Sequence, residues 1–486
     1  MPGTSTRLRC LMDGTWRGAR LKPNPCRHTA MSSPTFTFLN HASFLLRTDH
    51  ALLLADPWLD GPVLNEAWSL LDRSTSSAAL IAELNASGLP VFIWCSRAQP
   101  DRLSTPFLRR FRAEFRGIAT FLYRQGRDWR LVDELRRNRF AVIECAEGQP
   151  RTLARELRLT AYANGEGDSY CLVQCGRRAI LHLGERALAT RAACRAAAER
   201  LRKANLRVDL LLTGFADMAW CGNPDNFARR EIAAEQGIER LALQAEAFRP
   251  RLIVPVASFA RFSRVDNAWL NHGRRTPLGV LEAPRLEAQR GLIRFLQPGG
   301  CFDLAFDTPA SLGAQHEQAL AHWMQYWRDR PEPLPRPNQA TVAELKDGFL
   351  RYRKKARARL HGLPRLLERL RLLRPLVLNL PDLRQTIELS YLRGLRLLAR
   401  EAQADVAMCS GTALYLLRAE DGFDTTYAGG CFWIMRASGL SAFGRFFLPQ
   451  RMGRRGLDRQ RPWAAGSVLL RATLEWAMRG IRTALR

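Results

Sequence analysis

Long apolar runs are missing from this 486-residue sequence. None of its segments is long and apolar enough for a membrane-spanning helix. The spacing Cys-x-x-Cys is also missing among its 11 cysteines, so zinc-finger, iron–sulfur and thioredoxin-like motifs find no support. Scattered cysteines in odd number are typical of a reducing compartment. We therefore expect a cytoplasmic protein.

Acidic residues are few compared with basic ones. The chain has 46 Asp and Glu against 74 Lys and Arg, which gives a net charge of +28 and a pI near 10.9. Such a charge favours anions, whether nucleic acid, anionic lipid, or phosphorylated and carboxylated molecules. Most of the excess is arginine, and a genomic preference for arginine codons gives the same composition. The charge alone therefore selects no partner.

The chain is long enough for two or three domains. Its first 30 residues lack periodicity and the apolar core of a signal peptide, so we expect a disordered leader, with Met31 as the natural start. Composition and proline content predict the boundaries that follow. The predicted segments are a leader at 1–30, a first domain at 31–310, a helix with a proline-rich linker at 311–340, and a basic C-terminal domain at 341–486.

One stretch organises the first domain. Val91 to Trp94 is an apolar run that predicts a buried strand. A polar loop follows, and then Ser104 and Pro106 have the residue types of a helix cap and first turn. In α/β proteins, loops that follow a strand and precede a helix carry much of the chemistry. This loop is therefore the first candidate site.

The loop sequence, Ser-Arg-Ala-Gln-Pro-Asp-Arg from position 96 to 102, resembles a known motif. The metallo-β-lactamase superfamily carries His-x-His-x-Asp-His in this setting. Its sugar-phosphate lactonase-like, phospholipase D-like and sialic-acid-hydroxylase-like branches write it as Ser-His-x-His-x-Asp-His, followed by Ser-x-x-Phe. Ser96, Asp101 and Ser104 match this pattern. The three histidine positions are held by Arg97, Gln99 and Arg102.

Two further segments carry the same resemblance. Residues 40–44 read Asn-His-Ala-Ser-Phe, and residues 56–59 read Asp-Pro-Trp-Leu, which is similar to the opening hairpin of these branches. His41 is interpreted either as a loop histidine that faces the site or as a hydrogen-bonded structural histidine. Asp56 is expected to cap or brace its turn.

Two later positions complete the candidate site. Ile180 to Leu183 predicts a strand, after which Glu185 stands where the superfamily has an aspartate that bridges both metals. Residues 255–267 resemble Pro-x-Ala-x-Phe-x-x-Phe-x-His-x-x-Asn, whose histidine is a metal ligand, and Arg264 occupies that position. The resemblance implies a four-layer αββα sandwich of the α/β class, followed here by a smaller, basic, mainly helical α+β region.

The replaced residues change the expected chemistry. Arginine keeps its proton and offers no lone pair, so it cannot bind a metal. Losing two divalent cations would leave buried acids uncompensated, and arginine would supply the missing positive charge. We hypothesise an arginine–carboxylate cluster that is either structural or a binding site for a phosphorylated or carboxylated ligand. The candidate ligand-binding residues are His41, Arg97, Gln99, Asp101, Arg102, Glu185 and Arg264.

We therefore expect a catalytically impaired protein of hydrolase-like fold that uses no cofactor. The alternative is an active hydrolase of an ester, lactone or phosphodiester, with one or two divalent metals (Zn, Fe or Mn) in a site rearranged around His41, Asp101 and Glu185. The pair of Cys-x-His and Cys-x-x-His motifs that a Rieske cluster needs is incomplete, because no Cys-x-x-His occurs, which argues against oxygenase chemistry.

The expected partner is a small anion such as a sugar phosphate or a nucleotide sugar. No recognised nucleic-acid motif accompanies the charge, so nucleic acid is the weakest alternative. Leu363 to Leu380 is rich in leucine and arginine. This stretch is interpreted as a helix packed on its own domain, with peripheral contact to an anionic membrane as the alternative.

Overall fold

The first layer of the fold is a seven-stranded sheet. The structure is a computed structural model that describes residues 33–126, 129–164, 168–328 and 334–454, and the predicted leader lies outside them. The strand order of this sheet is β15-β1-β2-β3-β5-β6-β7. Its strands are β1 (Thr35–Asn40), β2 (Ser43–Arg47), β3 (Leu52–Ala55), β5 (Val91–Cys95), β6 (Ala119–Arg124), β7 (Ala141–Cys145) and β15 (Cys301–Asp303).

A six-stranded sheet with the order β13-β12-β11-β10-β9-β8 forms the second layer. Strands β3, β5, β6 and β7 of the first sheet are parallel, as are β11, β12 and β13 of the second. The strands of the second sheet are β8 (Pro150–Ala154), β9 (Leu157–Asn164), β10 (Asp168–Cys175), β11 (Arg178–Gly184), β12 (Leu210–Thr213) and β13 (Leu252–Pro255).

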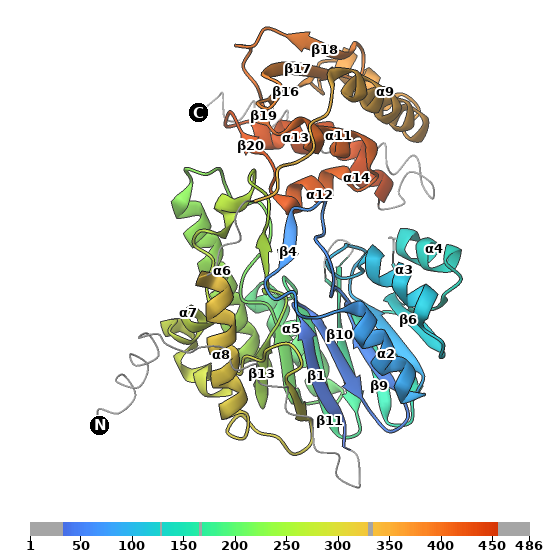
Figure 1. Cartoon of the computed structure of the whole chain (residues 1–486), viewed down its shortest axis with the longest axis vertical. Helices are drawn as coiled ribbons and strands as arrows, with labels where there is room; N and C mark the ends of the chain where they lie inside the picture. The colour runs from blue at the N-terminus through green and yellow to red at the C-terminus, as the bar shows by residue number, and fades with distance from the viewer. Residues whose placement is uncertain (1–32, 127–128, 165–167, 329–333, 455–486) are drawn as a thin grey trace. The chain divides into compact units, whose positions relative to one another are not determined.

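Alternation of side chains along the strands explains the layering. In β2, Phe44 and Leu46 join the core between the sheets, whereas Leu45 points to a second core on the outer face. That outer face is covered by α2 (Ser77–Ser87), α3 (Thr105–Glu114) and α4 (Trp129–Arg137). Helices α5 (Arg191–Lys203) and α6 (Phe227–Phe248) cover the other sheet, and Figure 1 shows α6 on the opposite side of the sheets from α2 and α3. The predicted four-layer αββα sandwich is confirmed.

Shorter elements complete this region. A two-stranded sheet pairs β4 with β14, and the remaining helices pack beside α6 or along the chain that follows β13. None of the described helices combines the length and apolar composition that crossing a bilayer requires. The elements are β4 (Trp68–Leu70), β14 (Ala260–Phe262), the 3₁₀ helices η2 (Ala268–Asn271) and η3 (Pro284–Leu292), α7 (Pro277–Leu281) and α8 (Gly313–Arg328).

The C-terminal region combines a five-stranded sheet with helices, as the predicted α+β class implies. Strands β16 (Leu376–Leu380), β17 (Gln385–Ser390), β18 (Gly394–Leu398), β19 (Val406–Ala407) and β20 (Trp433–Ile434) form it in the order β18-β17-β16-β19-β20. The interpretation of Leu363 to Leu380 as one helix was wrong over Leu376–Leu380, which form β16 and pair with β17 in a hairpin. The helices are α9 (Val342–Arg359), α10 (Leu363–Arg369), α11 (Ser410–Arg418), α12 (Gly422–Gly429), α13 (Gly439–Phe446) and α14 (Leu448–Arg454).

This region contacts the loops of the sandwich. Trp220 stacks on Phe432 with ring centroids 5.2 Å apart, and Trp269 stacks on Trp433 at 5.3 Å. The side chain of Asn223 exchanges two hydrogen bonds with the backbone of Ile434. All these residues belong to the same compact unit of the fold. The loop that follows β12 is therefore held between the sandwich and the C-terminal sheet.

Candidate functional site

The candidate site lies where parallel strands of the two sheets end. Asp56 follows β3, Ser96 follows β5, and Glu185 comes just after β11. The carboxyl ends of parallel strands meet at one edge of a sheet, which is where α/β folds place their sites. Because the two sheets pack face to face, polar residues from both can meet there.

Arg97 connects the two sheets. Its Nη2 lies 2.6 Å from Asp101 Oδ2 and 3.2 Å from Glu185 Oε2. Its Nη1 lies 3.8 Å from Asp168 Oδ2, beyond hydrogen-bond distance. The side chain is only 11% exposed, and the Asp101 and Glu185 side chains are 0% and 3% exposed. Arg97 is therefore a buried cation whose charge is compensated by carboxylates from both sheets.

Arg102 is a second buried cation beside it. Its Nε lies 3.1 Å from Asp101 Oδ2, and its Nη1 and Nη2 lie 3.9 Å from Asp56 and 4.0 Å from Glu185. Only 2% of this side chain is exposed. Two guanidinium groups thus share the Asp101 and Glu185 carboxylates. We call Arg97, Asp101, Arg102 and Glu185 the guanidinium cluster.

The acids beside these arginines titrate differently. Burial acts to raise the pKa of Asp101, but Arg97 and Arg102 outweigh it and lower this pKa to about 2. Burial raises the pKa of Asp56 to about 6, although Arg102 and the hydrogen bonds from Ser96 act in the opposite direction. Asp101 is therefore a fixed anion, whereas Asp56 changes charge in mildly acidic solution.

Asp56 braces the loop that carries the cluster. Its two carboxylate oxygens accept hydrogen bonds from the backbone N–H of Ser96 at 2.8 Å and from the Ser96 hydroxyl at 2.7 Å. Asp56 has a φ of 45°, in the left-handed region that non-glycine residues rarely adopt. Asp56 therefore braces its turn, as the sequence predicted. The predicted cap is also present, because the Ser104 side chain accepts from Phe107 N and Pro106 lies in the first turn of α3.

Glu185 is held by the loop that follows β12. Its Oε1 accepts a hydrogen bond from the backbone N–H of Met218. Gly214, at the start of that loop, donates to the carbonyl of Gly184, and a Cβ on Gly214 would lie 3.1 Å from the Cα of Glu185. A side chain at Gly214 would therefore push the Glu185 backbone away by a few tenths of an ångström. The loop therefore fixes Glu185 in a position to face Arg97.

Two buried histidines stand beside the cluster without hydrogen bonds. Neither ring nitrogen of His41 or of His182 has a hydrogen-bond partner in the described chain. Burial, together with Arg102, lowers the pKa of His41 well below its ordinary value and that of His182 to about 3. Both rings are therefore neutral near pH 7. His41 contacts Trp58 edge-on, which is a packing contact rather than the hydrogen bond that one interpretation expected.

Two residues predicted for the site, Gln99 and Arg264, are not part of the guanidinium cluster. The backbone carbonyl of Gln99 accepts from the N–H groups of Arg102 and Leu103 and so shapes the loop. The Arg264 guanidinium binds Asp266 through Nε at 2.8 Å and Nη2 at 2.6 Å. It also donates to the carbonyl of Asn65 and to the Thr412 hydroxyl. Arg264 thus ties the sandwich to α11 of the C-terminal region.

Arg274 is the arginine that sequence reasoning missed. It donates to the backbone carbonyls of Ala260 and Ser258. Burial lowers its pKa to about 10, while the charge of Glu185 acts to raise it, and its own charge helps lower the pKa of His41. Arg274 is thus a half-buried cation within electrostatic reach of Glu185, ten positions beyond the predicted Arg264. No signal in the sequence distinguishes it from the other arginines of this segment.

The residues at the site do not fit a pair of metals. Within the described chain, no group of three or more His, Cys, Asp or Glu side chains is placed to hold a metal ion. The two carboxylates that match the superfamily pattern accept hydrogen bonds from Arg97. Structural and catalytic zinc sites need several neutral imidazole, thiolate or carboxylate donors on one ion. Here guanidinium groups, which are donors only, occupy those positions.

Comparison with known proteins finds partial likenesses to solved structures at low sequence identity. No protein-family model and no curated protein matches the chain. Igni18, a metallo hydrolase from the archaeon Ignicoccus hospitalis, is 15% identical over 56% of this chain and 98% of its own, with a TM-score of 0.36. The diiron β-hydroxylase CmlA from Streptomyces venezuelae is 15% identical over 56% of this chain and 54% of its own, with a TM-score of 0.39. A possible metal-dependent hydrolase from Veillonella parvula is 10% identical over 56% and 100%, with a TM-score of 0.40.

These are likenesses of fold. Other solved structures that resemble the chain include a metallo-β-lactamase fold protein from Bacillus subtilis. The two facing sheets with helices outside them are the αββα arrangement that the sequence motifs predicted. The described chain therefore contains a four-layer αββα sandwich.

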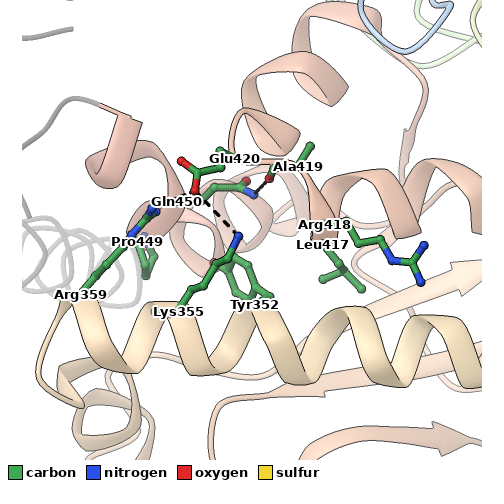
Figure 2. A pocket seen from close by; sticks show the side chains of 10 residues that line it. Tyr352, Lys355, Arg359, Leu417, Arg418, Ala419, Glu420, Pro449 and Gln450 are labelled. Carbon is green, nitrogen blue, oxygen red and sulfur yellow. Dashed lines mark hydrogen bonds and ion pairs between the residues drawn. The ribbon is translucent and has the colours of Figure 1, made fainter. Parts of the chain in front are cut away.

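Two hollows lie away from the cluster. One, of about 20 Å³, lies between α9, α11 and α14, where Figure 2 shows Lys355 and Arg359 pointing toward Glu420. Such a volume holds about one water molecule. The other measures about 440 Å³ and is lined by residues 59–62 and by Glu66 and Arg73, among others. No side chain of the guanidinium cluster lines either hollow, so neither is the predicted site.

Proposed function

We propose that this chain is a metal-independent protein of metallo-β-lactamase-like fold that binds a small phosphorylated or carboxylated ligand without hydrolysing it. The observation that supports the proposal is the position of Arg97. Its Nη2 contacts Asp101 and Glu185 closely, whereas its Nη1 has only the looser contact with Asp168 at 3.8 Å. Among the described residues, one side of the guanidinium is thus held by two close carboxylates, and the other has a looser contact that a ligand could replace.

Asp168 is the carboxylate that a ligand would replace. Its side chain is 38% exposed, unlike the buried acids of the cluster. A phosphate or carboxylate that took its place would gain a charge-assisted hydrogen bond from a cation that is already oriented. Because Asp101 and Glu185 already orient Arg97, its side chain loses less conformational entropy when a ligand binds. Sugar phosphates and nucleotide sugars carry such groups.

The same contacts argue against hydrolysis. In this fold a metal would activate the attacking water. The acids that would bind it are hydrogen-bonded to guanidinium donors, and a change of their partners would leave buried cations uncompensated. We infer that the two guanidinium groups neutralise these two acids, so that neither carboxylate is left to bind a metal.

A thermal-shift titration at constant ionic strength tests this proposal. Inorganic phosphate, citrate, a hexose phosphate and a nucleotide sugar are compared with chloride. A ligand that binds only the folded state raises the melting temperature as its concentration passes the dissociation constant. Asp168→Asn removes the competing carboxylate and should tighten binding by about fivefold to tenfold. Asp49→Asn, an equal change of charge at another exposed acid, is the control.

Two results would contradict the proposal. One is the absence of any shift with all four anions. The other is an equal gain in affinity for Asp168→Asn and Asp49→Asn, because that would show an effect of net charge and not of Arg97.

A further inference from the structure

Several large apolar side chains are exposed among cations in the C-terminal region. Leu350 on α9 is 56% exposed, Leu366 and Leu370 at α10 are 52% and 58% exposed, and Leu392 is 43% exposed. Other leucines of the same segment, such as Leu367 and Leu376, are buried in the core of the C-terminal sheet. The predicted packing of this helix on its own domain therefore explains only the buried leucines. The exposed leucines leave much of their apolar surface in contact with solvent.

These leucines belong to one continuous surface. Arg353, one helical turn after Leu350, donates to the carbonyl of Leu392 at 3.5 Å. Arg365, next to Leu366, donates through Nε to the carbonyl of Tyr391 at 3.2 Å. The turn between β17 and β18 thus joins α9 to α10, and Figure 1 shows α9 beside these strands. We call Leu350, Arg353, Arg365, Leu366, Leu370 and Leu392 the leucine–arginine surface.

The cations of this surface lack acidic partners. Burial, the nearby charge of Arg365 and the weaker opposing charge of Glu368 together lower the pKa of Arg353. Glu368 is buried and accepts hydrogen bonds from Ser390 and the backbone of Tyr391. In the described chain, Lys354 and Arg357 on the same helix form no ion pair with a carboxylate. Two neighbouring guanidinium groups and two further cations thus concentrate positive charge around exposed leucines.

We propose that the leucine–arginine surface docks this protein on an anionic lipid bilayer. Arg353, Arg365 and the neighbouring cations would bind headgroup phosphates, and the four leucines would enter the boundary between headgroups and acyl chains. Leucine mixed with cations suits this interface, where long basic side chains reach the headgroups from an apolar contact. Proteins that bind single-stranded nucleic acid instead place aromatic side chains among their cations, and this surface presents leucines. The bilayer is therefore the favoured occupant.

Vesicle co-sedimentation of the full chain tests the proposal. The wild type should bind vesicles of phosphatidylcholine mixed with phosphatidylglycerol, and should bind pure phosphatidylcholine much more weakly. Lys354→Gln/Arg357→Gln should weaken binding to the anionic vesicles roughly 25-fold, at about fivefold for each charge. Leu366→Ser/Leu370→Ser should weaken it by about tenfold or more through lost apolar contact. All four side chains are exposed, so the variants should fold as the wild type does.

Matched substitutions on the sandwich give the controls. Arg155→Gln/Arg158→Gln removes two exposed cations, and Ile118→Ser removes a residue that is 75% exposed. Neither control should change vesicle binding more than twofold. The proposal is overturned if the wild type shows no preference for anionic vesicles, or if the controls weaken binding as much as the surface variants do. It is also overturned if the surface variants lose affinity for duplex DNA but keep their affinity for vesicles, because the surface would then serve nucleic acid.

Discussion

Arg97 donates to the Glu185 carboxylate across the space between the two sheets, with Nη2 3.2 Å from Oε2. Arg97 follows a strand of the first sheet and Glu185 a strand of the second. In the metal-binding members that the sequence resembles, metal ions would join these two positions. Here a guanidinium group makes the connection. This contact has consequences for stability, for the effect of pH and for metal content.

Asp101 should be essential to the cluster. In Asp101→Asn, the buried cations of Arg97 and Arg102 lose a shared anion, and we expect the free energy of unfolding to fall by about 3 to 5 kcal/mol. Urea unfolding measures it. Asp347→Asn breaks an exposed ion pair with Arg351 and should cost less than about 1 kcal/mol. Equal losses in the two variants would show that the cluster is no more important than a surface pair.

Asp56 should make the protein less stable as the pH rises. Its folded pKa of about 6 lies above the ordinary value of 3.8, so between these values the folded state binds more protons than the unfolded state. The contribution of Asp56 therefore falls by about 2 kcal/mol between pH 4 and pH 6, out of about 3 kcal/mol over its whole titration. Asp56→Asn removes this slope. Chemical unfolding of the wild type and of Asp56→Asn at several pH values gives the difference in their free energies of unfolding, and the change of that difference with pH is the slope. A difference that stays constant from pH 4 to pH 6 would contradict the raised pKa of Asp56.

His182 should have the opposite effect. Its folded pKa of about 3 lies below the ordinary value of 6.5, so the unfolded state binds the extra proton, and stability is lost as the pH falls from 6.5 toward 3. His182→Phe should remove that loss and should leave stability at pH 8 unchanged or higher, because neither ring nitrogen has a hydrogen bond to lose. The same unfolding series measures this effect. A fall in stability at pH 8 of more than about 2 kcal/mol would indicate a bonded ring.

Some of the site follows from the sequence because it depends on local order. Ser104 and Pro106 predicted a helix start, and Asp56 predicted a braced turn, since short polar side chains at strand and helix ends have few alternatives. Glu185 was predicted from the resemblance to the metallo-β-lactamase superfamily, which has an aspartate at this strand end, and the structure puts it beside Arg97. The four-layer sandwich was likewise implied by that resemblance.

Other features could not be read from the sequence. Arg264 and Arg274 lie in a segment of short and irregular elements, where one-residue shifts leave no periodic trace. Arg264 is instead held by its local pair with Asp266 and by tertiary hydrogen bonds to Asn65 and Thr412. Residues 376–398 mix leucine with polar residues at spacings that also suit a helix, and pairing with neighbouring strands decides that they form hairpins.

Arg264 should stabilise the contact between the sandwich and α11. Arg264→Lys keeps the charge but loses the paired hydrogen bonds to Asp266 and the bond to Thr412, so we expect a loss of about 2 kcal/mol in the free energy of unfolding. Arg264→Met should cost about 3 to 5 kcal/mol because buried Asp266 is left unpaired. Thermal or urea unfolding checks the order of the two variants. A lysine variant as stable as the wild type would mean that only the charge matters.

The central claim is that guanidinium groups take the place of a metal pair, and elemental analysis tests it most directly. The full chain is produced in medium supplemented with zinc, iron and manganese and is purified without chelator. The account predicts far less than one equivalent of any of these metals per chain, with no gain in melting temperature when Zn²⁺ or Mn²⁺ is added. Two equivalents of metal per chain would contradict it, and the protein should then be assayed as a hydrolase.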